Sequence, residues 1–295
     1  MDAFISHSSK NRAVATRLET ALEAQGLRVW LDDSEIRLGV LLREELQTSI
    51  QRCRMLVLLW SKSASESRWI NAEWLMAFHL GKFIVPCVLD DTALPQCLQS
   101  SVFLNLTRVG VATVDRLTRA IKDAPAAANP LAPVMRSEEP ELKKAINGLV
   151  NGQQAMMDRL LKREVDTAAQ IQALLDTSMD AAIQLWPLDP VIVNLGGYHL
   201  KNAYMLKYWD AIQAGRAPRD ELLDQAERRF FEALWIDPTD PSALNGLGSI
   251  LILERELAAA EFFIRAAIAA AKKQGMASYP AAEHDLGVVL HYKRT

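Results

Sequence analysis

The sequence contains one short pattern that could place two reactive groups together, Trp69-Ile70-Asn71-Ala72-Glu73. Residues four apart share a face of an α-helix, so this spacing would present an indole ring beside a carboxylate in a ligand site. The same pattern also fits an ordinary helix, in which Trp69 packs into the core and Glu73 faces solvent. Which interpretation holds depends on the strands and helices that surround the pattern.

The first 124 residues alternate β-rich runs with amphipathic helical patterns. Strands are predicted at Ala3–Ser6, Arg28–Asp32, Met55–Trp60, Phe83–Leu89 and Val102–Leu106. Helices are predicted at Asn11–Gln25, Leu42–Arg52, Arg68–Leu80 and Val111–Asp123, with at most two helical turns in Leu94–Ser101. The third and fourth strands are nearly continuous apolar runs, which are typical of parallel strands covered on both faces. This alternation predicts an α/β fold with a doubly wound parallel sheet, in which Pro86 marks a bulge or an early strand end.

Polar side chains follow the first and third predicted strands. In a flavodoxin-like five-stranded sheet of order 2-1-3-4-5, the ligand crevice lies between the carboxyl ends of these two strands. The first strand ends in Ser6-His7-Ser8-Ser9-Lys10 and the third in Ser61-Lys62-Ser63, just before the helix that carries Glu73. Hydroxyl groups, a carboxylate and an aromatic ring therefore converge, which favours the ligand-site interpretation.

Several segments, taken in order, resemble the motifs of a TIR (Toll/interleukin-1 receptor) domain. They are Asp2–Lys10 (DAFISHSSK), Val29–Gly39 (VWLDDSEIRLG), Ser61 with Trp69 and Glu73, and Gly81–Pro86 (GKFIVP). The resemblance covers residues 1–124 in both order and spacing. The chain departs from many members at Val40, where they have Asp after the glycine of the second segment.

The resemblance implies an activity, because the enzymatic branch of this family consumes NAD+ and carries a glutamate at the position of Glu73. Ordinary glycoside hydrolysis needs two carboxylates, one of which protonates a poor leaving group. Nicotinamide leaves NAD+ as a neutral molecule, so one carboxylate can suffice by stabilising the oxocarbenium-like charge on the ribose. Glu73 fits that catalytic role, and Trp69 could stack on the nicotinamide ring or exclude water.

The resemblance also implies the residues that would surround the substrate. By position, the substrate-binding residues are Trp69, Ser6, His7, Ser8, Lys10, Asp32, Leu41 and Ser61. Lys10 would contact the diphosphate or, alternatively, be an exposed residue at a helix start. In the family, the loop after the second strand makes contacts between domains; here this assembly loop is Asp33, Ser34, Glu35, Ile36, Arg37, Leu38 and Gly39. Asp33 and Ser34 could equally be turn and capping residues.

The rest of the chain predicts a second domain. Residues 125–140 (PAAANPLAPVMRSEEP) form a Pro-rich linker, and residues 141–176 are expected to form one connecting helix. The segment ending at Pro190 echoes the segment ending at Pro241, and residues 177–295 resemble tetratricopeptide repeats, an all-α family with a period of about 34 residues. The two prolines are 51 residues apart, so an insertion is expected at Asp210–Arg219.

Composition restricts the partners. The net charge of −3 gives no reason to expect nucleic-acid binding, and no apolar stretch predicts a membrane segment or a leader. Three cysteines without metal-ligand spacing fit a reducing cytoplasm and predict no metal site. The chain lacks a Gly-rich phosphate loop, so NAD+ is expected as a substrate and no cofactor is predicted.

The resemblance therefore predicts an NAD+ glycohydrolase. Activation is expected through self-association of TIR domains, or through a trigger, protein or peptide that the helical repeats bind, in a bacterial antiphage or cell-suicide role. Two alternatives stay open. The TIR domain could be a non-enzymatic adaptor, or the product could be a cyclic ADP-ribose signal instead of ADP-ribose.

Overall fold

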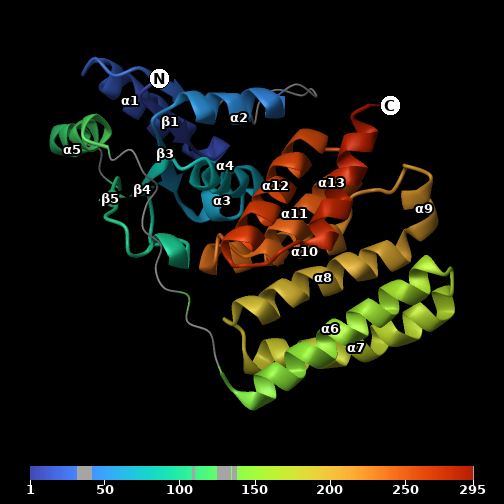
Figure 1. Cartoon of the computed structure of the whole chain (residues 1–295). Coiled ribbons are helices and arrows are strands. Elements are labelled where there is room, and N and C mark those ends of the chain that lie inside the picture. The colour runs from blue at the N-terminus through green and yellow to red at the C-terminus, as the bar shows by residue number, and fades with distance from the viewer. Residues whose placement is uncertain (32–41, 108–109, 125–133, 135–137, 295) are drawn as a thin grey trace. The chain divides into compact units, whose positions relative to one another are not determined.

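The computed structural model describes residues 1–31, 42–107, 110–124, 134 and 138–294, with no side-chain detail for 42–46. The chain divides into two units, Met1–Pro133 and Val134–Thr295 (Figure 1). No helix among the described residues is long and apolar enough to cross a membrane.

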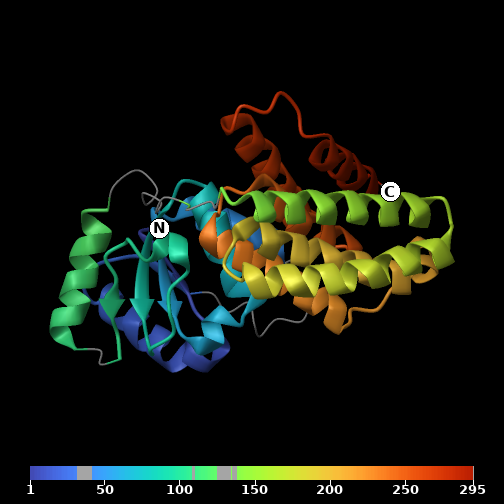
Figure 2. The ribbon, with the colours of Figure 1, turned by 90° about the horizontal axis from the view of Figure 1, so that it is seen from below.

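A five-stranded parallel sheet forms the centre of the first unit (Figure 2). Its strands are β1 (Ala3–Ser6), β2 (Val29–Leu31), β3 (Met55–Trp60), β4 (Phe83–Val88) and β5 (Leu104–Asn105). The strand order β2-β1-β3-β4-β5 confirms the predicted flavodoxin-like arrangement. The helical elements are η1 (Ser9–Asn11), α1 (Arg12–Glu23), α2 (Leu42–Arg52), α3 (Lys62–Ser65), α4 (Arg68–His79), η3 (Gln96–Leu98) and α5 (Val111–Lys122).

Both faces of this sheet are buried. Alternate strand residues, including Ile5, Val57 and Val85, form one core cluster with α1 and α5. The residues between them, such as Phe4 and Leu56, point to the opposite face, where α4 packs on β1, β3 and β4. This two-sided burial explains why β3 is apolar at every position.

Pro86 lies inside β4 in an unbroken register opposite Leu58 of β3, so the expected bulge or early strand end is wrong. The carbonyl of Val88 accepts from Leu106 on the β5 side, and backbone groups two residues apart point the same way. The nitrogen of Pro86 therefore faces β5, which pairs with β4 only from Cys87 onward. Because no ladder hydrogen bond is needed there, the missing N–H costs nothing.

The second unit consists of helices arranged mainly as antiparallel pairs (Figure 1). They are α6 (Pro140–Leu161), α7 (Val165–Leu185), α8 (Pro190–Lys207), α9 (Trp209–Gln213), α10 (Glu221–Ile236), α11 (Pro241–Leu253), α12 (Leu257–Lys273) and α13 (Pro280–Tyr292). The pairs are α6 with α7, α8 with α10, and α11 with α12, and α13 packs on the last pair. Four of these helices begin with proline at the first turn, where no intrahelical N–H is needed. The predicted insertion at Asp210–Arg219 falls in the connection between α8 and α10.

The expectation of one connecting helix over residues 141–176 is wrong, because the chain turns back between α6 and α7. Arg163 adopts a left-handed backbone conformation at φ 63° and ends the first helix. Apolar residues seven apart on each helix, such as Leu149 and Met156 on α6 and Ala168 and Leu175 on α7, meet in one core cluster. The pair is therefore part of the second unit.

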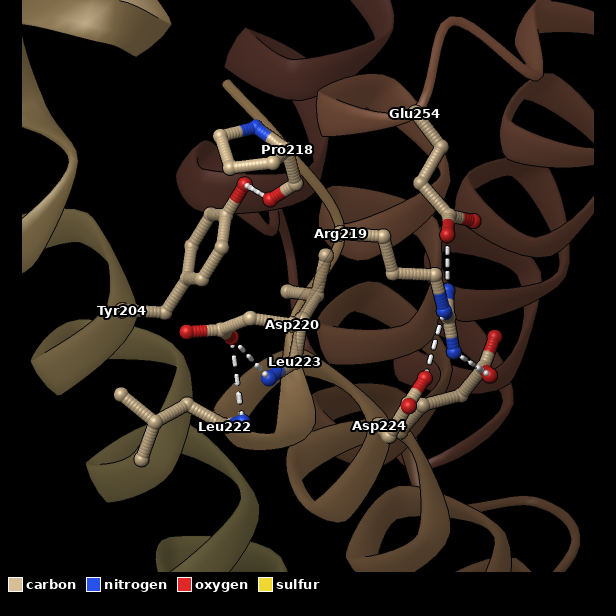
Figure 3. A network of polar contacts seen from close by, with 9 residues as sticks. Tyr204, Pro218, Arg219, Asp220, Leu222, Leu223, Asp224 and Glu254 are labelled. Carbon is tan, nitrogen blue, oxygen red and sulfur yellow. Dashed lines mark hydrogen bonds and ion pairs between the residues drawn. The ribbon is translucent and has the colours of Figure 1, made fainter.

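The pairs α8–α10 and α11–α12 are linked by a polar network centred on Arg219 (Figure 3). Its guanidinium contacts the carboxylates of Asp224 at 2.5 Å and Glu227 at 2.7 Å on α10, and that of Glu254 at the end of α11. Beside it, Asp220 caps α10 by accepting from the backbone N–H of Leu222 and Leu223. One cation thus holds three carboxylates.

Candidate functional site

Glu73 lies in the middle of α4 and is fully buried. The sequence left open whether this carboxylate faces solvent, and its burial excludes that interpretation. A carboxyl group inside a protein is unfavourable unless its surroundings compensate it, so its presence there calls for a structural or chemical reason. Trp69, one turn earlier, is only half-buried, and the guanidinium of Arg68 lies 5.0 Å from its ring centroid.

The start of α4 is fixed by a set of hydrogen bonds that positions both residues. The side chain of Ser67 caps the helix by accepting from the N–H of Ile70. The amide of Asn71 donates to the carbonyls of Ser65 at 3.0 Å and Ser67 at 2.9 Å. The indole of the fully buried Trp74 donates to Asn71 in turn, at 3.2 Å. The first two turns of α4, with Trp69 and Glu73 on them, are therefore held in one orientation.

A second group of polar side chains lies where β1 and β3 end, and we call Ser8, Asn11, Ser61 and Ser63 the serine–asparagine cluster. The hydroxyls of Ser8, Ser61 and Ser63 donate to the side-chain oxygen of Asn11 at 2.6, 2.7 and 3.1 Å. The oxygens of Ser8 and Ser63 are also 2.7 Å apart. Ser61 in addition caps α3 by accepting from the N–H of Ala64. The two strand ends are thus joined directly at the switch point of the sheet.

The structure brings together some of the predicted site residues and leaves others apart. Ser8 and Ser61 meet through Asn11, and Ser6 and His7 are buried at the end of β1. Lys10 is exposed in η1 and makes no hydrogen bond or ion pair with the residues that the structure describes. Asp32, Leu41 and the assembly loop Asp33, Ser34, Glu35, Ile36, Arg37, Leu38 and Gly39 lie outside the described residues.

Two members of the cluster, Asn11 and Ser63, were not assigned as substrate-binding residues, although Ser63 was predicted among the hydroxyl groups that follow the third strand. Asn11 was predicted only as the first residue of a helix, and its short polar side chain after the first strand is the signal it offers. Their role depends on the distance between two strand ends that are far apart in sequence. The periodicity of the sequence does not predict that distance.

The environment of the cysteines argues against catalysis by a cysteine thiolate. All three are free and buried, and desolvation raises the pKa of the Cys87 thiol to about 12 and that of Cys53 to about 11. A thiolate nucleophile is therefore not available from either residue near neutral pH. Within the described part of the chain, no group of three or more His, Cys, Asp or Glu side chains could hold a metal ion.

We expect Asn11→Ala to lower the free energy of unfolding of the first unit by about 1–2 kcal/mol, because three hydroxyls lose their shared acceptor. Chemical denaturation followed by circular dichroism measures this. Asn11→Asp keeps an acceptor oxygen in the same place and should lose less than half as much. Equal losses in both variants would contradict the acceptor role.

Comparison with known proteins agrees with the fold of the first unit. Residues 3–121 match the model of the TIR domain family. The chain is 28% identical over 95 residues to a "Probable 2′ cyclic ADP-D-ribose synthase TcpO" of Methanobrevibacter olleyae, covering 31% of this chain and 28% of that protein. It is 32% identical over 106 residues to a "Probable 2′ cyclic ADP-D-ribose synthase BdTIR" of Brachypodium distachyon, covering 34% of this chain and 47% of that protein.

These matches span less than half the length of either relative and lie on about a third of this chain. No solved structure matches the chain. The family match begins at the first residue of β1 and ends within α5, so it coincides with the parallel sheet and its helices. Residues 3–121 therefore form a TIR domain.

Proposed function

We propose that the TIR domain cleaves the nicotinamide–ribose bond of NAD+, with Glu73 as the catalytic carboxylate. The observation that carries the proposal is the position of Glu73, which is fully buried on the helix pair that follows β3, one turn after a partly exposed Trp69. A carboxylate shielded from water interacts more strongly with a developing positive charge than an exposed one. The names of both relatives are consistent with chemistry on ADP-ribose.

In this mechanism the residues of the chain bind and orient NAD+, and the leaving group is the nicotinamide that NAD+ already carries. The pyridinium of NAD+ departs as neutral nicotinamide when the bond to the ribose breaks, so no side chain needs to donate a proton to it. Glu73 would stabilise the oxocarbenium-like ribose. Ser8 and Ser61 would border the crevice at the strand ends, and Lys10 would act from its mouth.

Two products are compatible with the same carboxylate. Attack by water on the ribose gives ADP-ribose, and attack by a hydroxyl of the same molecule gives a cyclic ADP-ribose. The names of the two relatives favour a cyclic product. Incubating the full chain with NAD+ and separating the products by chromatography with mass spectrometry tests the activity and distinguishes the products. Absence of nicotinamide release in both dilute and assembled samples would favour the non-enzymatic adaptor instead.

The helical unit would control this activity. We assign it to tetratricopeptide-like repeats, because α8, α11 and α13 each begin with proline and carry glycine seven residues later, at Gly197, Gly248 and Gly287. At two of these glycines a Cβ atom would lie within 3 Å of an adjacent helix, 2.7 Å from Phe230 at Gly197 and 2.5 Å from Ile264 at Gly248. A repeat unit of this kind would bind a protein or peptide trigger and promote TIR self-association, as expected of an antiphage effector.

The contribution of Trp69 can be measured separately from that of Glu73. We expect Trp69→Ala to lower kcat/KM for NAD+ by about tenfold, because the indole offers a stacking surface for the nicotinamide ring. Trp69→Phe retains an aromatic face and should stay within about threefold of the wild type. If the alanine and phenylalanine variants lose the same activity, stacking is not the function of this residue.

A further inference from the structure

The helical unit contains a groove of about 540 Å³ between α7 and α10, with α8 as its floor. This volume lies in the range of small-molecule binding sites. Met179 and Ile183 of α7, with Gly196 and Leu200 of α8, give it an apolar surface. At Gly196 a Cβ atom would be in ordinary van der Waals contact with Ile183, Arg229 and Met179, at 3.7 to 4.0 Å.

The two walls of the groove differ in charge. Asp176 and Asp180 line it from α7, and Arg228, Arg229 and Glu232 line it from α10. The charges of Arg229 and Glu232 offset each other at 3.0 Å, and Asp176 contacts His199 at 2.8 Å.

The other two charges, Asp180 and Arg228, are available to a ligand. Both side chains are exposed, and neither side chain has a hydrogen bond or an ion pair among the described residues. They are not within ion-pair distance of each other. The groove thus offers one unpaired carboxylate on one wall and one unpaired guanidinium on the other.

His199, which lines the acidic end of the groove, contacts a buried glutamine side chain. His199 is 7% exposed, and its ring nitrogens lie 3.2 Å from the side-chain nitrogen of Gln172. The same nitrogen donates to Asp176 at 3.2 Å. Gln172 itself is not among the residues that line the groove; its contacts hold His199 and Asp176 in place at this end.

We propose that this groove binds a small zwitterion of the α-amino-acid type with an apolar side chain. The ammonium group would lie toward Asp176 and Asp180, the carboxylate toward Arg228, and the side chain on Met179 and Leu200. A ligand with only negative charge would face the carboxylates of α7, and one with only positive charge would face the guanidiniums of α10. Only a zwitterion places a charge of opposite sign toward both Asp180 and Arg228. The proposal does not depend on the NAD+ chemistry of the TIR domain.

Calorimetric titration of the full chain with L-leucine tests the proposal. We expect saturable one-to-one binding with a Kd between roughly 10 μM and 1 mM, as suits a ligand of few heavy atoms. 4-Methylpentanoate lacks the ammonium group and 3-methylbutylamine lacks the carboxylate. Each should bind at least about tenfold more weakly than leucine, because each loses one charge-assisted contact.

Two variants locate the binding. Asp180→Asn keeps the shape of the side chain and Arg228→Gln keeps a polar one; each removes one charge and should weaken leucine binding about tenfold. Asp158→Asn, at an exposed position on α6 outside the groove, is the matched control and should stay within about twofold. Thermal melting of each variant checks that the fold is retained. The proposal is overturned if leucine gives no saturable heat, if an analogue lacking one charge binds equally well, or if both groove variants retain wild-type affinity.

Discussion

Replacing Glu73 by Gln is expected to lower the turnover of NAD+ by at least about 100-fold, the effect of removing one preorganised electrostatic group from an active site. Gln has nearly the size of Glu, so the packing of α4 against the sheet is retained while the negative charge is lost. The oxocarbenium-like ribose then forms without a compensating charge. Because that charge develops only in the transition state, the loss should fall on kcat more than on KM.

The measurement is nicotinamide release under conditions that promote assembly, with the wild type and the variant at the same concentration. Glu66→Gln is the matched control, because Glu66 is an exposed carboxylate on the turn just before α4. Its activity should stay within about twofold of the wild type, as expected of an exposed charge screened by salt. Activity of Glu73→Gln within threefold of the wild type would remove Glu73 from the mechanism.

The second large effect concerns stability. We expect Arg219→Met to lower the free energy of unfolding of the helical unit by about 3–5 kcal/mol, because it leaves buried carboxylates without their cation. The side chains of Glu227 and Glu254 are only 4% and 11% exposed, and both contact the Arg219 guanidinium. Figure 3 shows the contact with Glu254. For a unit of this size, such a loss corresponds to a decrease in Tm of at least about 6 °C.

Thermal melting followed by circular dichroism measures this effect. Arg216→Met is the control, since Arg216 lies on the same connection, is exposed and contacts no carboxylate among the described residues. Its Tm should change by less than about 2 °C. Adding Glu227→Gln to Arg219→Met should recover part of the loss, because it removes one of the uncompensated buried charges. If the double variant is less stable than Arg219→Met, charge burial is not the cause.

Much of the fold follows from local patterns. The bounds of β1, β3 and α2 agree with prediction to the residue, because continuous apolar runs and helical periodicity are properties of neighbouring residues. The strand order also follows, since alternating strands and helices have few ways to bury both faces of a sheet. Strand β5 is shorter than predicted at both ends and β2 begins one residue later than predicted, because a strand extends only as far as its partner provides hydrogen bonds.

The candidate site is only partly predictable for the same reason. The spacing of Trp69 and Glu73 is a local fact, and so the side-by-side arrangement on α4 could be predicted. The burial of Glu73 is not local, because it depends on how α4 packs against β1, β3 and β4. The contacts of Asn11 are not local either, since it accepts from serines fifty and fifty-two positions away.

The sequence by itself determined the two-part organisation, the parallel sheet and the pairing of an indole with a carboxylate. Tertiary structure decided where residues 141–176 turn back, how Pro86 stays within a strand, and which carboxylates share Arg219. Near Arg163 no proline or glycine interrupts the helical pattern. The turn forms because two apolar faces bury each other once the chain reverses. Local preference sets which elements form, and the burial of surface between distant segments sets where they end and which side chains meet.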